Sequence, residues 1–331
     1  MPGPTCDSMD EDMQADPHFT LPSDRDQRYG CAAPATLAVS LDSTASPVRR
    51  WTVLPSLLRC SHWIKNVFVL APLLFSLEFL NPPSIFAAVH ATLLFCLAAS
   101  AVYVFNDYHD RNRDILNPVN AARPLACGAV SPSGARQLII LLIVMLAMGG
   151  VVSPGVLTVI CVYLLLNVGY TLRWRQVPML ELLCVTAGFG LRVLAGAVAI
   201  SVPLSPWMLT ATLCLACFMV VGKRRSELLE GLGSSRSVLC HYTPRALDFA
   251  AVVSACGAIA CYLLYVSLLR PELWWSAPLV VLGIGRYWIV FRRHNRGCSP
   301  TSILYRDPVL QGIVLSWSIV CLVSLWPVRT P

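Results

Sequence analysis

Long apolar stretches alternate with short polar connections over most of this chain. Nine such stretches follow one another, and each has the length, about 17 to 24 residues, that a helix needs to cross a membrane. Helices are expected because lipid offers no hydrogen-bond partner to an open backbone. The fold class predicted is all-α, a polytopic membrane protein of about nine transmembrane helices. The predicted spans are 63–80, 84–106, 136–153, 155–172, 179–202, 206–222, 247–269, 273–291 and 309–326.

Residues 1–50 differ from everything that follows. They are polar, rich in Pro, Ser and Asp, and without apolar periodicity, which predicts a disordered tail. We find no basic stretch followed by an apolar one that would indicate a secretory signal peptide. Two parts are therefore expected: a tail over 1–50 and an integral membrane catalytic domain over 51–331, with order beginning near Trp51.

Positive charge is confined to alternate connections. The tail and the connections after the second, fourth, sixth and eighth spans carry arginine or lysine, whereas the other connections carry only Arg270. Basic loops stay on the cytoplasmic side of a membrane. The pattern therefore predicts a plasma-membrane protein with a cytoplasmic N-terminus, an odd number of spans and its chemistry on the cytoplasmic face.

Composition narrows the class of ligand. The chain is 56% hydrophobic and 13% charged, with a net charge of +7 that comes almost entirely from arginine. Such a surface suits phosphorylated ligands and anionic lipid headgroups. Alternatively, the basic loops only set the orientation of the protein in the membrane. No basic soluble module indicates nucleic acid. The 14 cysteines lie mainly in apolar stretches, so Cys214 and Cys217 are interpreted as packing residues rather than a metal or redox site.

The strongest chemical signal follows the second span. Asp107, Asp110 and Asp114 are three and four residues apart, which places their carboxylates on one stripe of a helix. Three like charges on one stripe favour a bound cation, and Mg²⁺ prefers carboxylate oxygens while leaving positions open for phosphate. A diphosphate held through Mg²⁺ is the functional interpretation. A solvated acidic helix end is the alternative.

Further candidates lie at the same face of the membrane. The Pro- and Gly-containing loop 117–128 carries Arg123, either a phosphate ligand or a topology signal. Glu181 and Arg192 share one stripe of the fifth span, so Glu181 is a candidate metal ligand and Arg192 a phosphate partner, unless the two form a structural pair. Lys223, together with Arg224 and Arg225, either holds phosphate or anchors a helix at the lipid surface.

The acidic string 106–114 resembles the NDxxDxxxD motif of the UbiA-type superfamily of intramembrane prenyltransferases. Strings GKRRSEL at 222–228, HYT at 241–243 and YTLR at 170–173 resemble its phosphoribosyltransferase branch, and the likeness covers about residues 51–326. It implies nine helices around a central cavity, Mg²⁺, 5-phosphoribosyl-1-pyrophosphate as donor and a polyprenyl phosphate similar to decaprenyl phosphate as acceptor. Glu181 stands where this branch usually has Asp, and Asn120 where it usually has Lys.

The predicted activity is thus Mg²⁺-dependent transfer of a phosphoribosyl group to a polyprenyl phosphate, in cell-wall arabinan precursor synthesis. Two alternatives remain open: a prenyltransferase that moves a polyprenyl group from its diphosphate to an aromatic acceptor, and a membrane transporter. The oligomeric state, a homo-oligomer included, is left open. The predicted metal-binding and catalytic residues are Asp107, Asp110, Asp114 and Glu181; the predicted substrate-binding residues are Lys65, Asn106, Arg123, Tyr170, Arg192, Lys223, Arg224 and Arg225.

Overall fold

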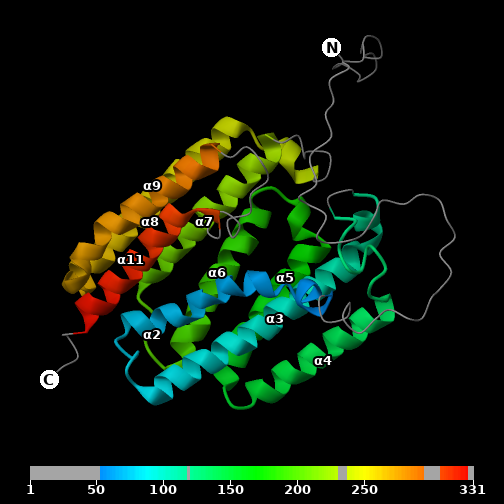
Figure 1. Ribbon diagram of the computed structural model, residues 1–331, viewed down its shortest axis with the longest axis horizontal. Helices are drawn as coiled ribbons and strands as arrows, with labels where there is room; N and C mark the ends of the chain where they lie inside the picture. The colour runs from blue at the N-terminus through cyan, green and yellow to red at the C-terminus, as the bar shows by residue number, and fades with distance from the viewer. Residues whose placement is uncertain (1–52, 118–119, 230–236, 294–305, 327–331) are drawn as a thin grey trace, which may run out of the picture. The chain divides into compact units, whose positions relative to one another are not determined.

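The computed structural model describes residues 53–117, 120–229, 237–293 and 306–326, and over these ranges it contains helices and no strands (Figure 1). The predicted tail over 1–50 and the start near Trp51 lie outside the described residues, so the division into two parts stays a prediction. The helices in chain order are η1 Cys60–Leu70, α2 Ala71–Phe75, α3 Pro82–Ile115, α4 Pro132–Gly150, α5 Pro154–Leu172, η2 Trp174–Gln176, α6 Leu180–Ala199, α7 Pro206–Leu229, η4 Ser237–His241, α8 Pro244–Leu269, η5 Pro271–Ser276, α9 Ala277–Arg293 and α11 Pro308–Leu325.

Eight helical segments of the described chain are long and apolar enough to cross a membrane, and Cys60–Phe75 is a shorter apolar helix. Each of the nine predicted spans overlaps one of these segments, so the prediction of an all-α polytopic membrane protein is confirmed. The short segment joins η1, a 3₁₀-helix, to α2. Because a 3₁₀-helix rises about 2.0 Å per residue and an α-helix about 1.5 Å, the pair extends about 30 Å, the thickness of the hydrocarbon core.

Proline and capping residues set where most helices begin. Proline stands in the first turn of α3, α4, α5 and α11, where its missing N–H is not needed. The side chains of Thr243 and Asp307 cap α8 and α11 by accepting hydrogen bonds from the N–H groups of Ala246 and Leu310. The local sequence therefore determines where these helices begin.

Helix α3 is longer than the predicted span 84–106. It continues to Ile115 and so carries the acidic string on its last turns. No Pro or Gly interrupts the sequence from residue 106 until Pro118, and nothing else ends a helix there. The aspartates thus lie on a continuous, rigid helix rather than in a loop.

Helix α6 joins two halves of the bundle, since it packs against η1, α3 and α5 as well as α7. One buried cluster, which includes Phe95 of α3 and Ile160 of α5, takes in Ala195 of α6. Another, built on α7, α8, α9 and α11, takes in Leu182 of α6. A Cβ atom at Gly196 would lie 1.9 Å from the Val69 carbonyl oxygen, so only glycine permits this approach of α6 to η1.

Candidate functional site

The three aspartates of α3 are buried at one end of the bundle. Their exposed fractions are 2% for Asp107, 8% for Asp110 and 4% for Asp114. With 3.6 residues per turn, Asp107 and Asp114 point within about 20° of one another, while Asp110 is turned by about 60°. Buried carboxylates need charged or hydrogen-bonding partners, and their partners define the site.

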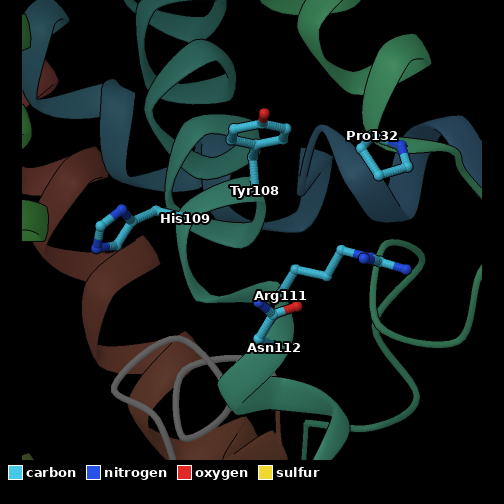
Figure 2. A pocket seen from close by; sticks show the side chains of 5 residues that line it. All are labelled: Tyr108, His109, Arg111, Asn112 and Pro132. Carbon is cyan, nitrogen blue, oxygen red and sulfur yellow. The ribbon is translucent and has the colours of Figure 1, made fainter.

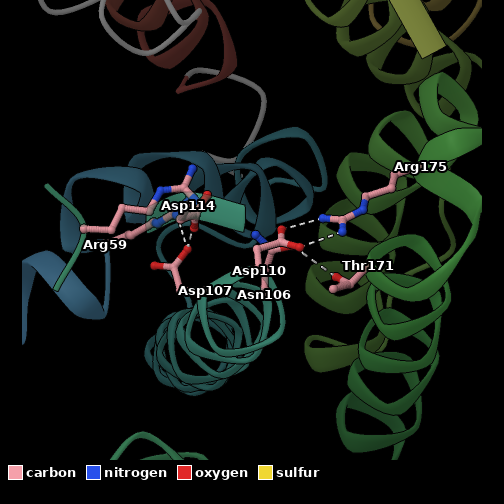
Figure 3. A network of polar contacts seen from close by, with 8 residues as sticks. Arg59, Asn106, Asp107, Asp110, Asp114, Thr171 and Arg175 are labelled. Carbon is pink, nitrogen blue, oxygen red and sulfur yellow. Dashed lines mark hydrogen bonds and ion pairs between the residues drawn. The ribbon is translucent and has the colours of Figure 1, made fainter. Parts of the chain in front are cut away.

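Arginines supply that partnership on one side of α3 (Figure 3). Asp107 accepts a hydrogen bond of 2.5 Å from Arg59, which precedes η1. Arg123 Nη1 lies 2.6 Å from Asp114 and 3.3 Å from Asp107, so these two carboxylates converge on one cationic nitrogen. Backbone turns hold Arg123 over α3. The Arg123 N–H donates to the Asn120 carbonyl, and the Arg123 carbonyl accepts from the Cys127 N–H.

Asp110 points to the neighbouring side of α3, toward the connection between α5 and α6 (Figure 3). Two nitrogens of Arg175, in η2, donate to its two oxygens at 2.5 and 2.6 Å. This paired geometry is the strongest that a carboxylate and a guanidinium form. The hydrogen bonds to Asp110 also raise the pKa of Arg175. Beside this pair, the Thr171 hydroxyl donates to the Asn106 side-chain oxygen at 3.4 Å.

Glu181 belongs to a second ion cluster at the start of α6. Its side chain is fully buried and lies 2.7 Å from Arg224 Nε of α7, and Arg224 also pairs with Glu227. Within the described ranges, no three acidic, His or Cys side chains lie close enough to hold a metal ion. The structure thus brings Asp107 and Asp114 together, gives Asp110 a separate partner, and places Glu181 in another cluster.

The three consecutive cations of α7 take three directions. Lys223 is 37% exposed and lies 3.7 Å from Glu227, whereas Arg224 is buried against Glu181. Arg225 turns to α8, where it lies 2.5 Å from Asp248. Arg224 and Arg225 therefore tie α7 to α6 and α8 in this structure, and their roles toward substrate stay predictions.

Arg192 lies deeper, at 5% exposure, among neutral acceptors. It donates to the Asn66 side-chain oxygen at 2.8 Å, the Gly188 carbonyl at 2.7 Å and the Tyr163 hydroxyl at 3.1 Å. Its guanidinium also lies 4.9 Å from the Tyr163 ring centre. Arg192 thus joins η1, α5 and α6 through uncharged acceptors, whereas Glu181 lies against Arg224.

Lys65, which sits on η1 beside this group, has a different environment. The charged groups that act on it are Arg192 and Arg59, both positive. Next to it, the buried His62 Nδ1 has no hydrogen-bond partner among the described residues, and its charged neighbours are Lys65, Arg59 and Lys223. Excess positive charge in a partly buried region favours an anionic ligand.

Sequence reasoning missed Arg59 and Arg175 as members of the site. Both belong to the basic connections, before the first and after the fourth predicted span. The available signal was their position three or four residues from a predicted span, on the same membrane face as the acidic string. Tyr170, a predicted substrate residue, is an electrostatic neighbour of both Arg175 and Arg224, so it lies near both ion clusters.

The donor set fits a divalent cation. Carboxylate and amide oxygens are the ligands that Mg²⁺ prefers, and Asp107 and Asp114 already converge on the single cationic nitrogen of Arg123. A small cation bound there requires Arg123 to move, and the 28% exposure of its side chain leaves it that freedom. The acidic end of α3 is therefore a candidate site for a metal ion and its anionic ligand.

A separate cavity of about 280 Å³ lies beside α3 and the start of α4 (Figure 2). Four of its five lining residues stand between the aspartates in the sequence of α3, and the fifth is Pro132 of α4. They are Tyr108, His109, Arg111, Asn112 and Pro132. Arg111 Nε donates to the Leu125 carbonyl at 3.3 Å, which fixes the loop beside the cavity. The central cavity implied by the family resemblance stays a prediction.

Comparison with known proteins agrees with the fold and with the family resemblance. Residues 67–303 match the UbiA prenyltransferase family. The chain is 32% identical to the decaprenyl-phosphate phosphoribosyltransferase of Corynebacterium glutamicum over 80% of this chain and 84% of that protein. It is 32% identical to the enzyme of the same name from Mycobacterium tuberculosis over 78% of this chain and 90% of that protein.

Solved structures show the same fold. A UbiA homolog from Archaeoglobus fulgidus, bound to DMAPP and Mg²⁺, superposes with a TM-score of 0.65 at 16% identity, covering 82% of this chain and 99% of that chain. At this identity the likeness speaks for the fold alone. Together with the family match, it confirms the prediction of a multi-pass membrane transferase. The chain belongs to the UbiA prenyltransferase family.

Proposed function

We propose that this enzyme transfers the phosphoribosyl group of 5-phosphoribosyl-1-pyrophosphate to a polyprenyl phosphate such as decaprenyl phosphate. The single observation that carries the proposal is the acidic end of α3, where three buried carboxylates are each held by an arginine. The choice of donor is supported by similarity to the two phosphoribosyltransferases over about four fifths of the chain. The cofactor proposed is Mg²⁺.

Asp107 and Asp114 would hold the Mg²⁺ ion, with Asp110 and the Asn106 side-chain oxygen on the adjoining face. When bound, the ion supplies positive charge that stabilises the departing pyrophosphate. The carboxylates compensate the ion's charge and orient it on a rigid helix. Glu181, in its own cluster with Arg224, is proposed to support the same substrate from α6 rather than from α3.

The arginines provide the other half of the site. Arg59, Arg123 and Arg175 are 22%, 28% and 18% exposed, so each can leave its carboxylate for a phosphate oxygen without crossing the protein core. Guanidinium groups bind phosphate with paired hydrogen bonds. Lys65 and Lys223 add charge on the side of η1, where the electrostatic neighbours are already positive. Donor and acceptor together bring several phosphate groups, which this excess of cations fits.

The chemical step needs no strong base. An oxygen of the lipid phosphate forms a bond to ribose C1 as the bond from C1 to the pyrophosphate oxygen breaks, and the electron pair leaves with pyrophosphate. A phosphate monoester is already ionised near neutral pH. The chain's residues therefore bind, orient and exclude water, and the cations beside C1 stabilise the charge that develops on the leaving group.

The location follows the distribution of charge. We propose that the acidic end of α3 lies at the cytoplasmic face of the plasma membrane, because Arg59, Arg123, Arg175 and the cations of α7 gather there. The polyprenyl acceptor enters from the bilayer, and the water-soluble donor enters from the cytoplasm. The product is a precursor for cell-wall arabinan.

A prenyltransferase activity is the second candidate, favoured by the family to which the chain belongs. The same metal site would then hold a polyprenyl diphosphate, and an aromatic ring would be the acceptor. One experiment separates the two activities. Purified enzyme is incubated with Mg²⁺, polyprenyl phosphate, an aromatic acceptor and either 5-phosphoribosyl-1-pyrophosphate or polyprenyl diphosphate.

Lipid products are then identified by mass spectrometry. We expect polyprenyl phosphate to gain one phosphoribosyl group, with release of pyrophosphate, only when the phosphoribosyl donor and Mg²⁺ are both present. A prenylated aromatic product would assign the second activity instead. An unmodified lipid together with consumed donor would mean hydrolysis and would contradict the proposal.

A further inference from the structure

The connection that leads into α6 contains an unusual turn. The Leu180 N–H donates to the Pro178 carbonyl at 2.7 Å, which closes a three-residue γ-turn around Met179. Met179 has φ 64° and ψ −45°, the values of the rarer, positive-φ form of this turn. Helix α6 begins at the next residue, and Glu181 follows in its first turn.

This conformation is strained for a residue with a side chain. Non-glycine residues with positive φ are uncommon, and such strain persists only where the surroundings hold it. Met179 is 62% exposed, so packing of its own side chain does not hold the turn. Another group has to fix its backbone.

Tyr242 supplies that group. Its hydroxyl oxygen accepts a hydrogen bond of 2.8 Å from the Met179 N–H, across 63 positions in the sequence. Tyr242 is itself well placed, because it lies between η4, which packs against η2 and α7, and Thr243, whose side chain caps α8. Its ring packs against the buried cluster that contains Leu182.

The turn controls the direction of Glu181. The Glu181 N–H donates to the Val177 carbonyl at 3.2 Å, and the Leu183 N–H donates to the Met179 carbonyl at 2.9 Å, so the first turn of α6 is built on Met179. Glu181 in turn lies 2.7 Å from Arg224. Glu181 and Arg224 are both electrostatic neighbours of Tyr242. A rotation at Met179 would therefore carry Glu181 away from its partner.

We propose that Tyr242 is a positioning residue: by holding the strained turn at Met179, its hydroxyl sets the direction of Glu181 toward Arg224. The inference rests on the proposed function for its kinetic consequence, because Glu181 and Arg224 are assigned there to the substrate. In this proposal Tyr242 acts through the start of α6 and not by binding donor or acceptor.

The test uses Tyr242→Phe, which keeps the ring and removes only the hydroxyl. The loss of one neutral hydrogen bond predicts a decrease of about fivefold in kcat, with an unchanged KM for polyprenyl phosphate. Hydrogen–deuterium exchange is measured in parallel on the full-length protein in detergent. The amides of 179–181 should exchange about fivefold faster in the variant. Tyr262→Phe is the matched control. The hydroxyl of Tyr262, on α8, forms hydrogen bonds with Ser276 of η5 and Trp317 of α11, away from this turn.

A second background makes the test sharper. Glycine adopts positive φ without strain, so in Met179→Gly the turn no longer depends on the tyrosine hydroxyl. Adding Tyr242→Phe to Met179→Gly should change kcat by less than twofold. An equal decrease in both backgrounds, or unaltered exchange at 179–181 in Tyr242→Phe, overturns the inference. If the enzyme proves to use a prenyl diphosphate, the proposed function fails, but the exchange measurement still decides the role of Tyr242.

Discussion

Two buried charged regions of this protein differ in how their charges are satisfied. At the acidic end of α3, each of three carboxylates pairs with an arginine, and those arginines are between 18% and 28% exposed. Around Arg192, a cation at 5% exposure is satisfied by an amide oxygen, a backbone carbonyl and a hydroxyl. The first region has exchangeable partners, and the second has fixed ones.

The difference separates a binding site from a structural centre. A carboxylate whose cation can swing away accepts another cation at little cost, because the charge balance is kept. Arg192 has no such exchange, since moving it would leave Asn66 and Tyr163 buried without their donor. Burial and charge alone do not distinguish the two regions; the exposure of the partner does.

The largest effect is expected from Asp107→Asn. The amide keeps the shape of the side chain but removes a negative charge that would hold Mg²⁺, so transfer should fall by about 100-fold or more, as it does when the stabilisation of charge on a leaving group is lost. The measurement is phosphoribosyl transfer by purified enzyme across Mg²⁺ concentrations. Folding is checked by the unchanged elution of the protein from a sizing column.

Asp248→Asn is the matched control for this change. Asp248 also pairs with an arginine, Arg225, but it lies on α8 and outside the α3 cluster. Its loss should alter transfer by less than about threefold, because partly exposed ion pairs contribute little. Equal losses in the two variants would show that the arginine pairs at this end of the bundle serve only the fold.

The second-largest effect is expected in the region around Arg192. In Arg192→Lys one ammonium cannot reach the three acceptors around it, so the free energy of unfolding should fall by about 2–3 kcal/mol. Thermal denaturation in detergent measures this change, and the KM values for both substrates should stay within twofold. A raised KM with unaltered stability would instead assign Arg192 to the substrate, as its place on the stripe of Glu181 predicted.

The sequence predicted the fold well because its signals are local. Apolar length places each span, prolines and capping side chains start the helices, and alternating basic loops order them. The acidic end of α3 was predicted for the same reason, since three aspartates on one helix have a spacing that does not depend on the rest of the chain. Helix α3 differed only in its length.

Partners distant in the sequence were not predicted. Asp110 meets Arg175 across 65 positions, and Arg192 meets Asn66 across 126. The sequence placed Glu181 and Arg192 on one stripe of a helix, and both do lie on α6. It did not indicate which neighbouring helix each side chain would face. That choice depends on tertiary packing, such as the close approach of η1 at Gly196.

The smallest effect comes from an acidic residue outside both regions. Asp307 caps α11 by accepting from the Leu310 N–H at 2.9 Å, and it pairs with Arg286 at 3.0 Å. Burial acts to raise the pKa of Asp307, but the hydrogen bonds from Leu310 and Arg286 outweigh it and hold this pKa below its ordinary value. Asp307→Ala should lower the stability of the protein by about 1 kcal/mol at neutral pH.

The sign of its pH dependence follows from the lowered pKa. The unfolded chain protonates Asp307 near pH 4, before the folded protein does, so the stabilisation is complete above about pH 4 and is lost as the pH falls through the folded-state pKa. The difference in denaturation temperature between wild type and Asp307→Ala should therefore be constant from pH 7 to pH 5 and shrink below pH 4. A difference as large at pH 3 as at pH 7 would mean that the side chain stabilises α11 without its charge. Asp307 would then be a neutral cap, unlike the carboxylates of α3, whose negative charge is what the metal site requires.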